Sequence, residues 1–251
     1  MEGAGLSMSQ SSIYIYCIIN SAEEINEPVD DRQIYSIPWR EQAALVSDFV
    51  KPLDMKKHIR ETALTHEKVA ELMMRRFTVL PMRLLTVVAD RGKVLSMLKE
   101  NYSDFEDNFE RLAQKAEFGL KVLWPVSQIK ERLQNDCKTH GPYEITSGVS
   151  PARTYMENKF GIYKAEKALQ EEAEKYITAT DEFFSGIAVE KRLEKLPTEK
   201  MLLKASYLVD KNRQDEVNIA FEKLRKAQPE LMYQFSGPWP PYNFIVMEKK
   251  M

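Results

Sequence analysis

The first half of the chain alternates between continuous apolar runs, which predict strands, and stretches with helical spacing. Ile13–Ile19 reads IYIYCII. Because it is aromatic and β-branched without polar alternation, this run predicts a central strand that is buried on both faces. The next residues, 20–32, are polar and predict a loop. Pro81 cannot donate a backbone hydrogen bond, so the run around it predicts an edge or bulged strand. Residues 34–37 predict a short strand or a bend, and the further expected strands are 43–50, 77–88 and 119–124.

Apolar side chains recur every three or four residues in three other segments of this half, which predicts helices there. These segments are 62–76, 90–116 with a break near Ser103, and 126–134. The resulting order over 13–135 is β-β-α-β-α-β. This order predicts an α+β domain of the ferredoxin-like type, with an antiparallel sheet and helices on one face.

The second half predicts a different domain, which begins beyond a polar linker at 136–151 that contains Gly and Pro. Residues 152–184 combine an apolar stripe with a Lys/Glu-rich outer face, which predicts a long helix, one arm of a coiled-coil-like pair. We therefore expect a C-terminal domain over 152–251, made of this helix and a small β-α-β unit. The unit has strands at 201–209 and 231–235, a helix at 212–227 between them, and a last strand at 244–247.

Composition narrows the class of protein. The 251 residues are 43% hydrophobic, enough to fill a core, and carry a formal net charge of −2. A nucleic-acid surface normally needs a basic excess, so no nucleic-acid partner is expected. No apolar run reaches the ~20 residues that cross a bilayer. Residues 1–12 lack a signal-peptide core and predict a flexible lead-in. The distant pair Cys17 and Cys137 predicts reduced thiols, so we expect a cytoplasmic protein without membrane contact.

The ionisable residues have no spacing that predicts catalysis. His58, His66 and His140 lack metal-ligand spacing, and Ala70 stands where a second zinc-binding histidine would follow His66. His66 therefore predicts a helix-surface or capping role. The sequence also lacks the phosphate-binding and nucleophile motifs of common enzymes. We expect no enzyme, no cofactor and no metal.

Four aromatic residues and one arginine have two possible interpretations each. Arg83, beside a predicted strand, favours a structural ion pair and leaves an anion-binding role open. For the aromatic residues, core packing is favoured over RNA base stacking because the Lys/Arg-Gly-Phe signature of RNA-binding sheets is missing. These aromatic residues are Tyr14, Tyr16, Trp124 and Phe244.

Several motifs together resemble those of one family, the gas vesicle accessory proteins GvpF/GvpL. They are LPMR (80–83), GLKVLW (119–124), LLKASYLVD (202–210) and, most specifically, SGPWPPYNF (236–244), in this order and at this spacing. The resemblance extends from about Ile13 to Val246.

The resemblance implies a two-domain, non-enzymatic protein. Its first half is expected to be a modified ferredoxin-like domain, and its second half to combine long helices with a small α/β part. Members of this family are gas vesicle assembly factors or minor structural components that give cells buoyancy. The implied partners are the hydrophobic shell protein GvpA and other accessory proteins. A ferredoxin-like module for nucleic acid or a small molecule is the alternative.

The chain departs from the family pattern after Arg83. The family continues with Phe-Gly-Thr, and this chain has Leu84, Leu85 and Thr86. The glycine that permits a tight bend is therefore absent, which places the family's local geometry in question.

The terminal SGPWPPYNF stretch predicts a rigid, extended strip, because its prolines restrict the backbone and Gly237 permits a positive φ. We expect a structural clasp that presses Trp239 and Tyr242 into a groove, with a partner-binding platform as the alternative. Twelve methionines suit adaptable apolar contacts. Such contacts are expected on the N-terminal sheet or on the 152–184 helix. The candidate structural or partner-contact residues are Arg83, Trp124, Pro238, Trp239, Tyr242 and Phe244.

Overall fold

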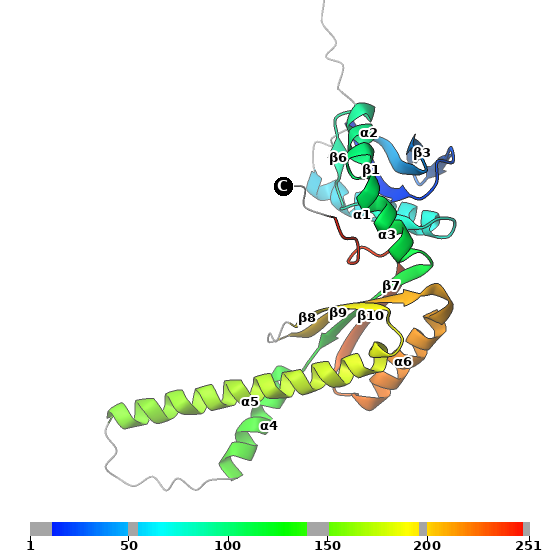
Figure 1. Ribbon diagram of the computed structural model, residues 1–251. Helices are drawn as coiled ribbons and strands as arrows, with labels where there is room; N and C mark the ends of the chain where they lie inside the picture. Colours follow the sequence, from blue (N-terminus) through cyan, green and yellow to red (C-terminus); the bar gives the residue numbers. More distant parts are fainter. Residues whose placement is uncertain (1–11, 50–54, 140–150, 196–199, 248–251) are drawn as a thin grey trace, which may run out of the picture. The chain divides into compact units, whose positions relative to one another are not determined.

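The computed structural model describes residues 12–49, 55–139, 151–195 and 200–247 (Figure 1). The chain divides into two compact units. The first contains 1–117 together with 238–251, and the second contains 118–237. The predicted boundary near 135 is therefore displaced, since the division falls inside a strand.

The expected linker and lead-in are also revised where the structure describes them. Helix α4 (Val126–Thr139) continues through 136–139, so the first residues of the predicted linker are helical. The rest of that linker before Pro151 lies outside the described residues. Ser12, the last residue of the predicted lead-in, begins a strand, and residues 1–11 are outside the described part.

The first unit is built on an antiparallel sheet with the order β2-β3-β4-β1-β5, and β6 also pairs with β1. The expected loop at 20–32 contains strand β2, because its alternation of exposed and buried residues suits a sheet edge. The predicted strand at 77–88 is two short strands separated by 82–86. The strands are β1 (Ser12–Ile19), β2 (Asn26–Val29), β3 (Arg32–Trp39), β4 (Gln42–Phe49), β5 (Val79–Pro81) and β6 (Val87–Val88).

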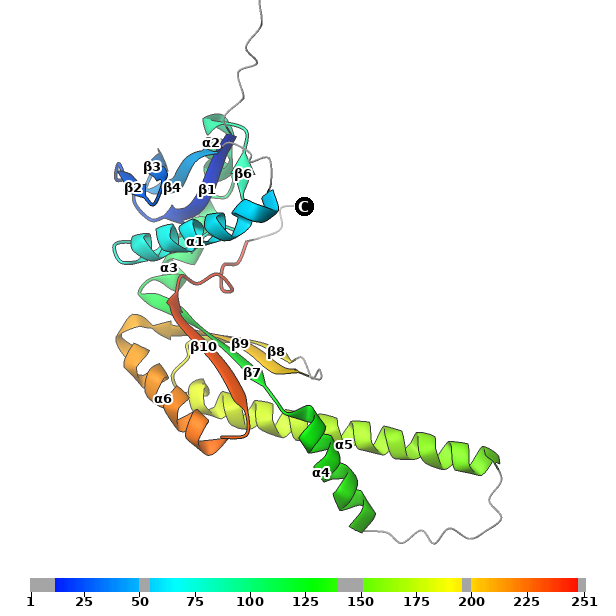
Figure 2. The same cartoon turned by 180° about the vertical axis from the view of Figure 1, so that it is seen from behind.

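Helices cover both faces of this sheet. Helix α1 (Met55–Met74) packs on β1 and β5, whereas α2 (Arg91–Glu100) contacts β3 and β4 and α3 (Tyr102–Leu112) contacts β5. Figure 1 shows α2 and α3 in front of the sheet, and Figure 2, from behind, shows α1 in front. The prediction of helices on one face was therefore wrong. The prediction that β1 is buried on both faces was correct, since Ile13–Ile19 are all buried.

The long helix expected at 90–116 is broken near the predicted place. Asn101 ends α2, and its side-chain Nδ2 donates a hydrogen bond to the Met97 carbonyl at 2.8 Å. A side chain that binds the backbone of its own last turn competes with continued helix, so α3 begins afresh at Tyr102.

The second unit is an antiparallel sheet with the order β10-β7-β9-β8. Helix α5 packs on β9, α4 and α6. It is a long helix, as expected, but no coiled coil is evident in the parts of the chain that the structure describes. The elements are β7 (Lys115–Leu123), α4, α5 (Pro151–Ser185), β8 (Glu190–Lys195), β9 (Met201–Asp210), the 3₁₀-helix η1 (Lys211–Arg213), α6 (Gln214–Ala227) and β10 (Met232–Trp239).

Stacked aromatic rings join the helices of the second unit to its sheet. Phe184 of α5 stacks on Tyr207 of β9 with ring centroids 4.7 Å apart. Phe221 of α6 stacks on Phe235 of β10 at 4.3 Å. Offset or tilted aromatic pairs add packing energy beyond the area they bury, so these contacts fix the two helices on one side of the sheet.

Candidate functional site

The terminal segment, residues 240–247, returns to the first unit and turns there instead of forming the predicted strand at 244–247. The Tyr242 amide donates to the Pro240 carbonyl at 2.8 Å, and the Phe244 amide donates to the Pro241 carbonyl at 3.1 Å. These local bonds use the amides that a strand would offer to a neighbour, so no ladder forms. Phe244 is fully buried and is the apolar anchor of the segment.

Three polar side chains of the first unit hold this segment. Asn108 of α3 donates Nδ2–H to the Val246 carbonyl at 2.6 Å and accepts the Val246 amide at 2.9 Å. The Glu117 carboxylate accepts the backbone amide of Asn243 at 2.9 Å and also its side-chain N–H. Arg111 donates to the Phe244 carbonyl.

These polar groups are tolerated in the interior because they are satisfied. Asn108 is 2% exposed and Glu117 is 4% exposed. A buried amide or carboxylate is costly without hydrogen bonds, so each side chain specifies the backbone position of its partner. Neither Asn108 nor Glu117 was predicted as a functional residue from the sequence. The signal was present, since Asn108 interrupts the apolar stripe formed by Phe105, Phe109 and Leu112.

A second hydrogen-bonded network fixes the connection 82–86 between β5 and β6. His66 of α1 is 3% exposed, so the predicted surface or capping role was wrong. Its Nε2 lies 3.0 Å from the Met82 carbonyl, and its Nδ1 lies 2.9 Å from the Tyr14 hydroxyl. A carbonyl only accepts, so Nε2 carries the hydrogen and the Tyr14 hydroxyl donates to Nδ1. The Tyr14 oxygen in turn accepts the Leu85 amide at 3.1 Å.

Burial explains the titration behaviour of this pair. Removal from water lowers the pKa of His66, and the hydrogen bond to the Met82 carbonyl opposes that effect in part. Burial likewise raises the pKa of Tyr14 to about 12, and the Leu85 amide partly offsets the rise. Both groups are therefore neutral near pH 7, and the network is held by uncharged hydrogen bonds.

Leu85 stands at the position where the motif resemblance leads us to expect glycine. Its φ is 65°, in the left-handed region that ordinary residues disfavour by about 1–2 kcal/mol. Its side chain packs on the core that contains Tyr14, Val69 and Met73. Leucine thus occupies a left-handed backbone position that favours glycine, and its core packing and the hydrogen bond to Tyr14 oppose the backbone strain.

A groove of about 370 Å³ lies between the 80–86 segment, α2–α3 and the terminal segment. We name it the Arg83 groove. Apolar side chains form most of its lining. The lining residues are Leu80, Pro81, Met82, Arg83, Thr86, Met97, Asn101, Phe105, Tyr242, Ile245 and Met247.

The structure brings some of the predicted site residues together. Arg83 and Tyr242 line the same groove, and Phe244 anchors the segment that carries Tyr242. Trp239 is half-buried at the end of β10 and Pro238 is exposed, while Trp124 is buried in the second unit. The Tyr242 ring lies 6.4 Å from the His66 ring, centroid to centroid, and the side chain is 37% exposed.

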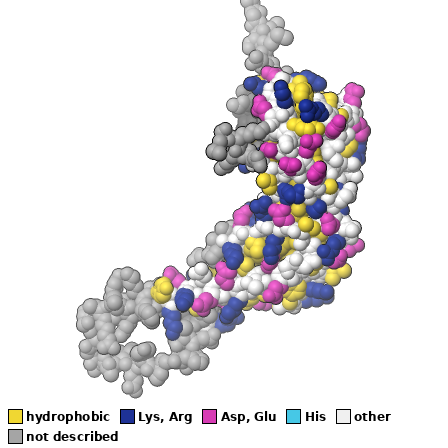
Figure 3. Space-filling model, viewed as in Figure 1, with side chains coloured by type: hydrophobic (Ala, Val, Ile, Leu, Met, Phe, Trp, Pro, Cys, Tyr) yellow, Lys and Arg dark blue, Asp and Glu magenta, His cyan; other side chains and the backbone are white. Residues whose placement is uncertain are grey.

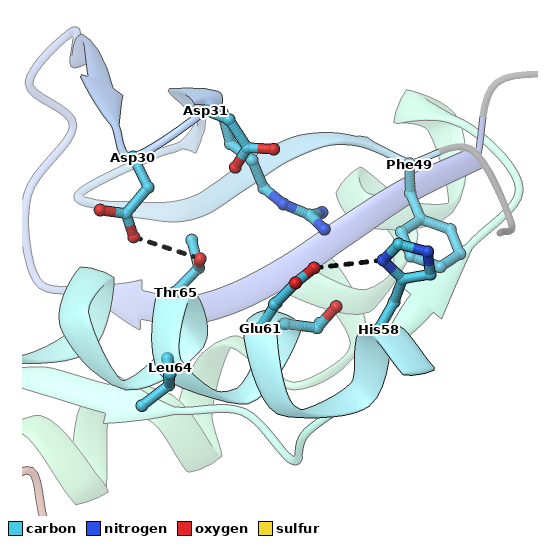
Figure 4. A pocket seen from close by; sticks show the side chains of 9 residues that line it. Asp30, Asp31, Phe49, His58, Glu61, Leu64 and Thr65 are labelled. Carbon is cyan, nitrogen blue, oxygen red and sulfur yellow. Dashed lines mark hydrogen bonds and ion pairs between the residues drawn. The ribbon is translucent and has the colours of Figure 1, made fainter. Parts of the chain in front are cut away.

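A second hollow, of about 570 Å³, is polar and lies beside the N-terminal part of α1 (Figure 4). Asp30 and Asp31 line one side of it, and His58 and Glu61 line the other. His58 Nδ1 pairs with Glu61 Oε2 at 3.1 Å, and Thr65 donates to Asp30 at 3.2 Å.

Two charged contacts are found at this hollow, since His58 pairs with Glu61 and Asp30 pairs with Lys68, which lies outside the lining. The hydrogen bond from Lys68 lowers the pKa of Asp30. Acid–base catalysis needs a proton donor and acceptor whose pKa values are displaced toward neutrality in a protected site. Asp30 has the opposite displacement and faces solvent, so this arrangement does not resemble a catalytic pair. Among the described residues, no group of three or more His, Cys, Asp or Glu side chains could hold a metal ion.

The surface charges are mixed in sign. Figure 3 shows Lys and Arg interspersed with Asp and Glu over the visible face. Nucleic-acid surfaces gather basic side chains along one stripe or patch, and this face does not. Within the described part of the chain, no helix is both long enough and apolar enough to span a membrane.

Comparisons with known proteins agree with the motif resemblance. The family model described as gas vesicle synthesis protein GvpL/GvpF matches residues 12–246. Gas vesicle protein F of a Streptomyces species is 26% identical over 211 residues, which covers 81% of this chain and 84% of the relative. Gas vesicle protein F1 of Halobacterium salinarum is 20% identical, with 93% and 92% covered.

Solved structures show the same fold. The crystal structure of the gas vesicle protein GvpF from Anabaena matches with a TM-score of 0.77 at 21% identity, covering 95% of this chain and 99% of that one. GvpF from Microcystis aeruginosa matches with a TM-score of 0.72 at 17% identity, covering 94% and 99%.

Proposed function

The chain belongs to the gas vesicle synthesis protein GvpL/GvpF family, and from this premise we propose that it is a non-enzymatic accessory protein of gas vesicle assembly. It binds the hydrophobic shell protein GvpA and other accessory proteins while the shell forms. Its place is the cytoplasm, in association with gas vesicles. The observation that carries the proposal is the match of the family model over 12–246.

Physical considerations support a binding role. A shell subunit with an apolar face aggregates in water unless another protein covers that face. This chain fills its own cores and still exposes large apolar side chains next to the Arg83 groove, including Leu84 and Met247. At the polar hollow, His58 pairs with Glu61, and Asp30 pairs with Lys68. Both features suit a protein that holds a partner rather than one that transforms a substrate.

We infer that both units are variants of the ferredoxin-like sheet. In the second unit, helices connect β7 to β8 and β9 to β10, and the order β10-β7-β9-β8 is that of a split β-α-β arrangement. In the first unit, β3, β4, β1 and β5 follow the same spatial order, and β2 replaces the first crossover helix. The first unit is therefore a modified ferredoxin-like domain, and the terminal segment completes it.

Gene deletion and co-purification together test the proposed function. Cells that form gas vesicles should lose flotation when the gene is deleted and recover it when the full chain is supplied again. The tagged full chain should retain GvpA from a co-expressing cell, in detergent concentrations that keep GvpA dispersed. Normal flotation in the deletion strain, with no GvpA retained by the tagged chain, would contradict the proposal. Retention of RNA or of a metabolite in place of GvpA would favour the alternative module.

A further inference from the structure

The Arg83 groove has the features of a docking site for one apolar segment of a partner protein. Its volume of about 370 Å³ lies near the lower end of the range, roughly 300–1,000 Å³, that binding pockets occupy. A cavity of this size takes a few side chains rather than a whole protein face. Its lining is mostly apolar, with Asn101, Thr86 and Arg83 as the polar exceptions.

Apolar side chains also extend the groove outward. Leu84 is 42% exposed and Met247 is 40% exposed, and Val87 and Val246 are exposed on the same two segments. Scattered single apolar residues on a surface need no explanation, but several exposed apolar residues beside a groove mark an interaction site. Met247 lines the groove itself, and Leu84, Val87 and Val246 each adjoin a lining residue in sequence.

Arg83 defines what the occupant must carry. Its backbone carbonyl accepts bonds from the Thr86 amide at 3.1 Å and the Thr86 hydroxyl at 2.7 Å, which fixes the start of its side chain. Its side chain is exposed and makes no hydrogen bond or ion pair with any residue in the described ranges. The structural ion pair that the sequence favoured is therefore not found there. A guanidinium beside an apolar groove matches a carboxylate on the occupant.

The groove is preformed on three sides. The His66–Tyr14–Leu85 network holds the 82–86 segment, Asn101 terminates α2 at the groove, and Asn108 fixes the terminal segment through Val246. A site whose walls are already ordered loses little conformational entropy on binding. Three methionine thioethers in the lining, from Met82, Met97 and Met247, adapt to the shape of an apolar ligand.

From these observations we propose that the Arg83 groove binds an apolar segment of the gas vesicle shell protein, with a carboxylate of that segment paired to Arg83. This inference rests on the proposed function, because it names the surface that the assembly role uses. An amphipathic helix that lays its apolar face in the groove fits this chemistry. Leu84 and Tyr242 contact the apolar face of this helix, and the pairing of its carboxylate with Arg83 fixes its position along the groove.

The test uses the tagged full chain, co-expressed with GvpA, and compares matched substitutions. Arg83→Glu should reduce the GvpA retained by on the order of tenfold, because it replaces an attractive charge pair with a repulsive one. Arg75→Glu makes the same charge change at another exposed position of the first unit and should retain GvpA as the wild type does. Leu84→Ser should weaken retention similarly, whereas Ile219→Ser, at an exposed residue of α6, should not.

A photo-crosslinking amino acid gives an independent readout that does not depend on lost binding. Placed at Leu84, it should crosslink to GvpA, and placed at Ile219 it should not. If the wild type retains GvpA, equal retention by all four variants together with no crosslink at Leu84 would overturn the groove assignment and leave the proposed function intact. If the wild type retains no GvpA, the proposed function itself fails, and the groove assignment fails with it.

Discussion

The hydroxyl of Tyr14 donates a hydrogen bond to Nδ1 of His66 across 2.9 Å, joining the central strand to helix α1 inside the first unit. Both partners are buried, and the remaining imidazole nitrogen donates to the Met82 carbonyl. Three segments distant in sequence thus meet at one imidazole. These hydrogen bonds attach residues 82–86, the connection that lines the Arg83 groove, to the buried core of the first unit.

Removing the Tyr14 hydroxyl should destabilise the protein. Tyr14→Phe leaves Nδ1 of His66 without its donor and the Leu85 amide without its acceptor, and an unsatisfied buried group costs about 1–3 kcal/mol. We expect the free energy of unfolding in urea to fall by about that amount. Tyr35→Phe is the matched control, because the Tyr35 hydroxyl binds Asp48 at an exposed site. A loss no larger than that of Tyr35→Phe would show that the Tyr14 network contributes little to stability.

His66 should make stability depend on pH below neutrality. Its folded pKa is lowered by burial, so the unfolded state binds the proton more readily. The contribution of neutral His66 to the free energy of unfolding is complete above the pKa of an unfolded histidine, about 6.5. It is lost as the pH falls below that value, and the free energy of unfolding then declines by up to about 1.4 kcal/mol per pH unit. Unfolding in urea between pH 7.5 and 5 measures this slope.

Two variants separate His66 from the other groups that titrate in this range. His66→Gln should lower stability at pH 7.5 and flatten the decline between pH 6.5 and 5. His58→Gln, at an exposed histidine of the same helix, is the matched variant against which the flattening in His66→Gln is compared. Equal slopes in the wild type and His66→Gln would argue against a buried neutral imidazole.

Substitutions at Leu85 can separate the strain of its left-handed backbone from the packing of its side chain. Both Leu85→Ala and Leu85→Gly remove the side chain, but only glycine adopts a φ of 65° without a steric penalty. We expect the glycine variant to be more stable than the alanine variant by about 1 kcal/mol. The order should reverse at Leu95 in the middle of α2, where alanine is favoured by about 1 kcal/mol. Denaturant unfolding of the four variants measures both differences.

The parts of the fold that could be predicted from the sequence are those set by local periodicity. The apolar run Ile13–Ile19 predicted the central strand β1, and the apolar stripe through Phe105 and Leu112 predicted helix α3. In both cases the buried face follows from spacing along a single element. Strand β2 was missed because a short edge strand needs few apolar residues, and NEPV resembles a loop.

The contacts that build the groove could not be predicted in this way. Asn108 and Val246 are 138 positions apart, and no pattern within either segment specifies the other. The local sequence predicts a helix-surface or capping role for His66, because its partners, Tyr14 and Met82, lie on other elements. Arg83 and Tyr242 were selected from motifs, but their common groove depends on the return of the terminal segment to the first unit.

Asn108 should control whether the terminal segment stays in place. Its amide makes both hydrogen bonds to the Val246 backbone, so Asn108→Ala leaves that amide and carbonyl without partners. We expect amide hydrogen exchange at Val246 to accelerate by at least about tenfold, because this N–H donates to Asn108 alone among the described residues, while the Leu45 amide in the central sheet keeps its protection. Asn26→Ala is the control, since Asn26 binds Gln33 at an exposed site.

Because Tyr242 and Met247 line the Arg83 groove, Asn108→Ala should also reduce the amount of GvpA that the tagged chain retains. Unchanged exchange at Val246 would mean that Phe244 and Glu117 are sufficient to hold the segment.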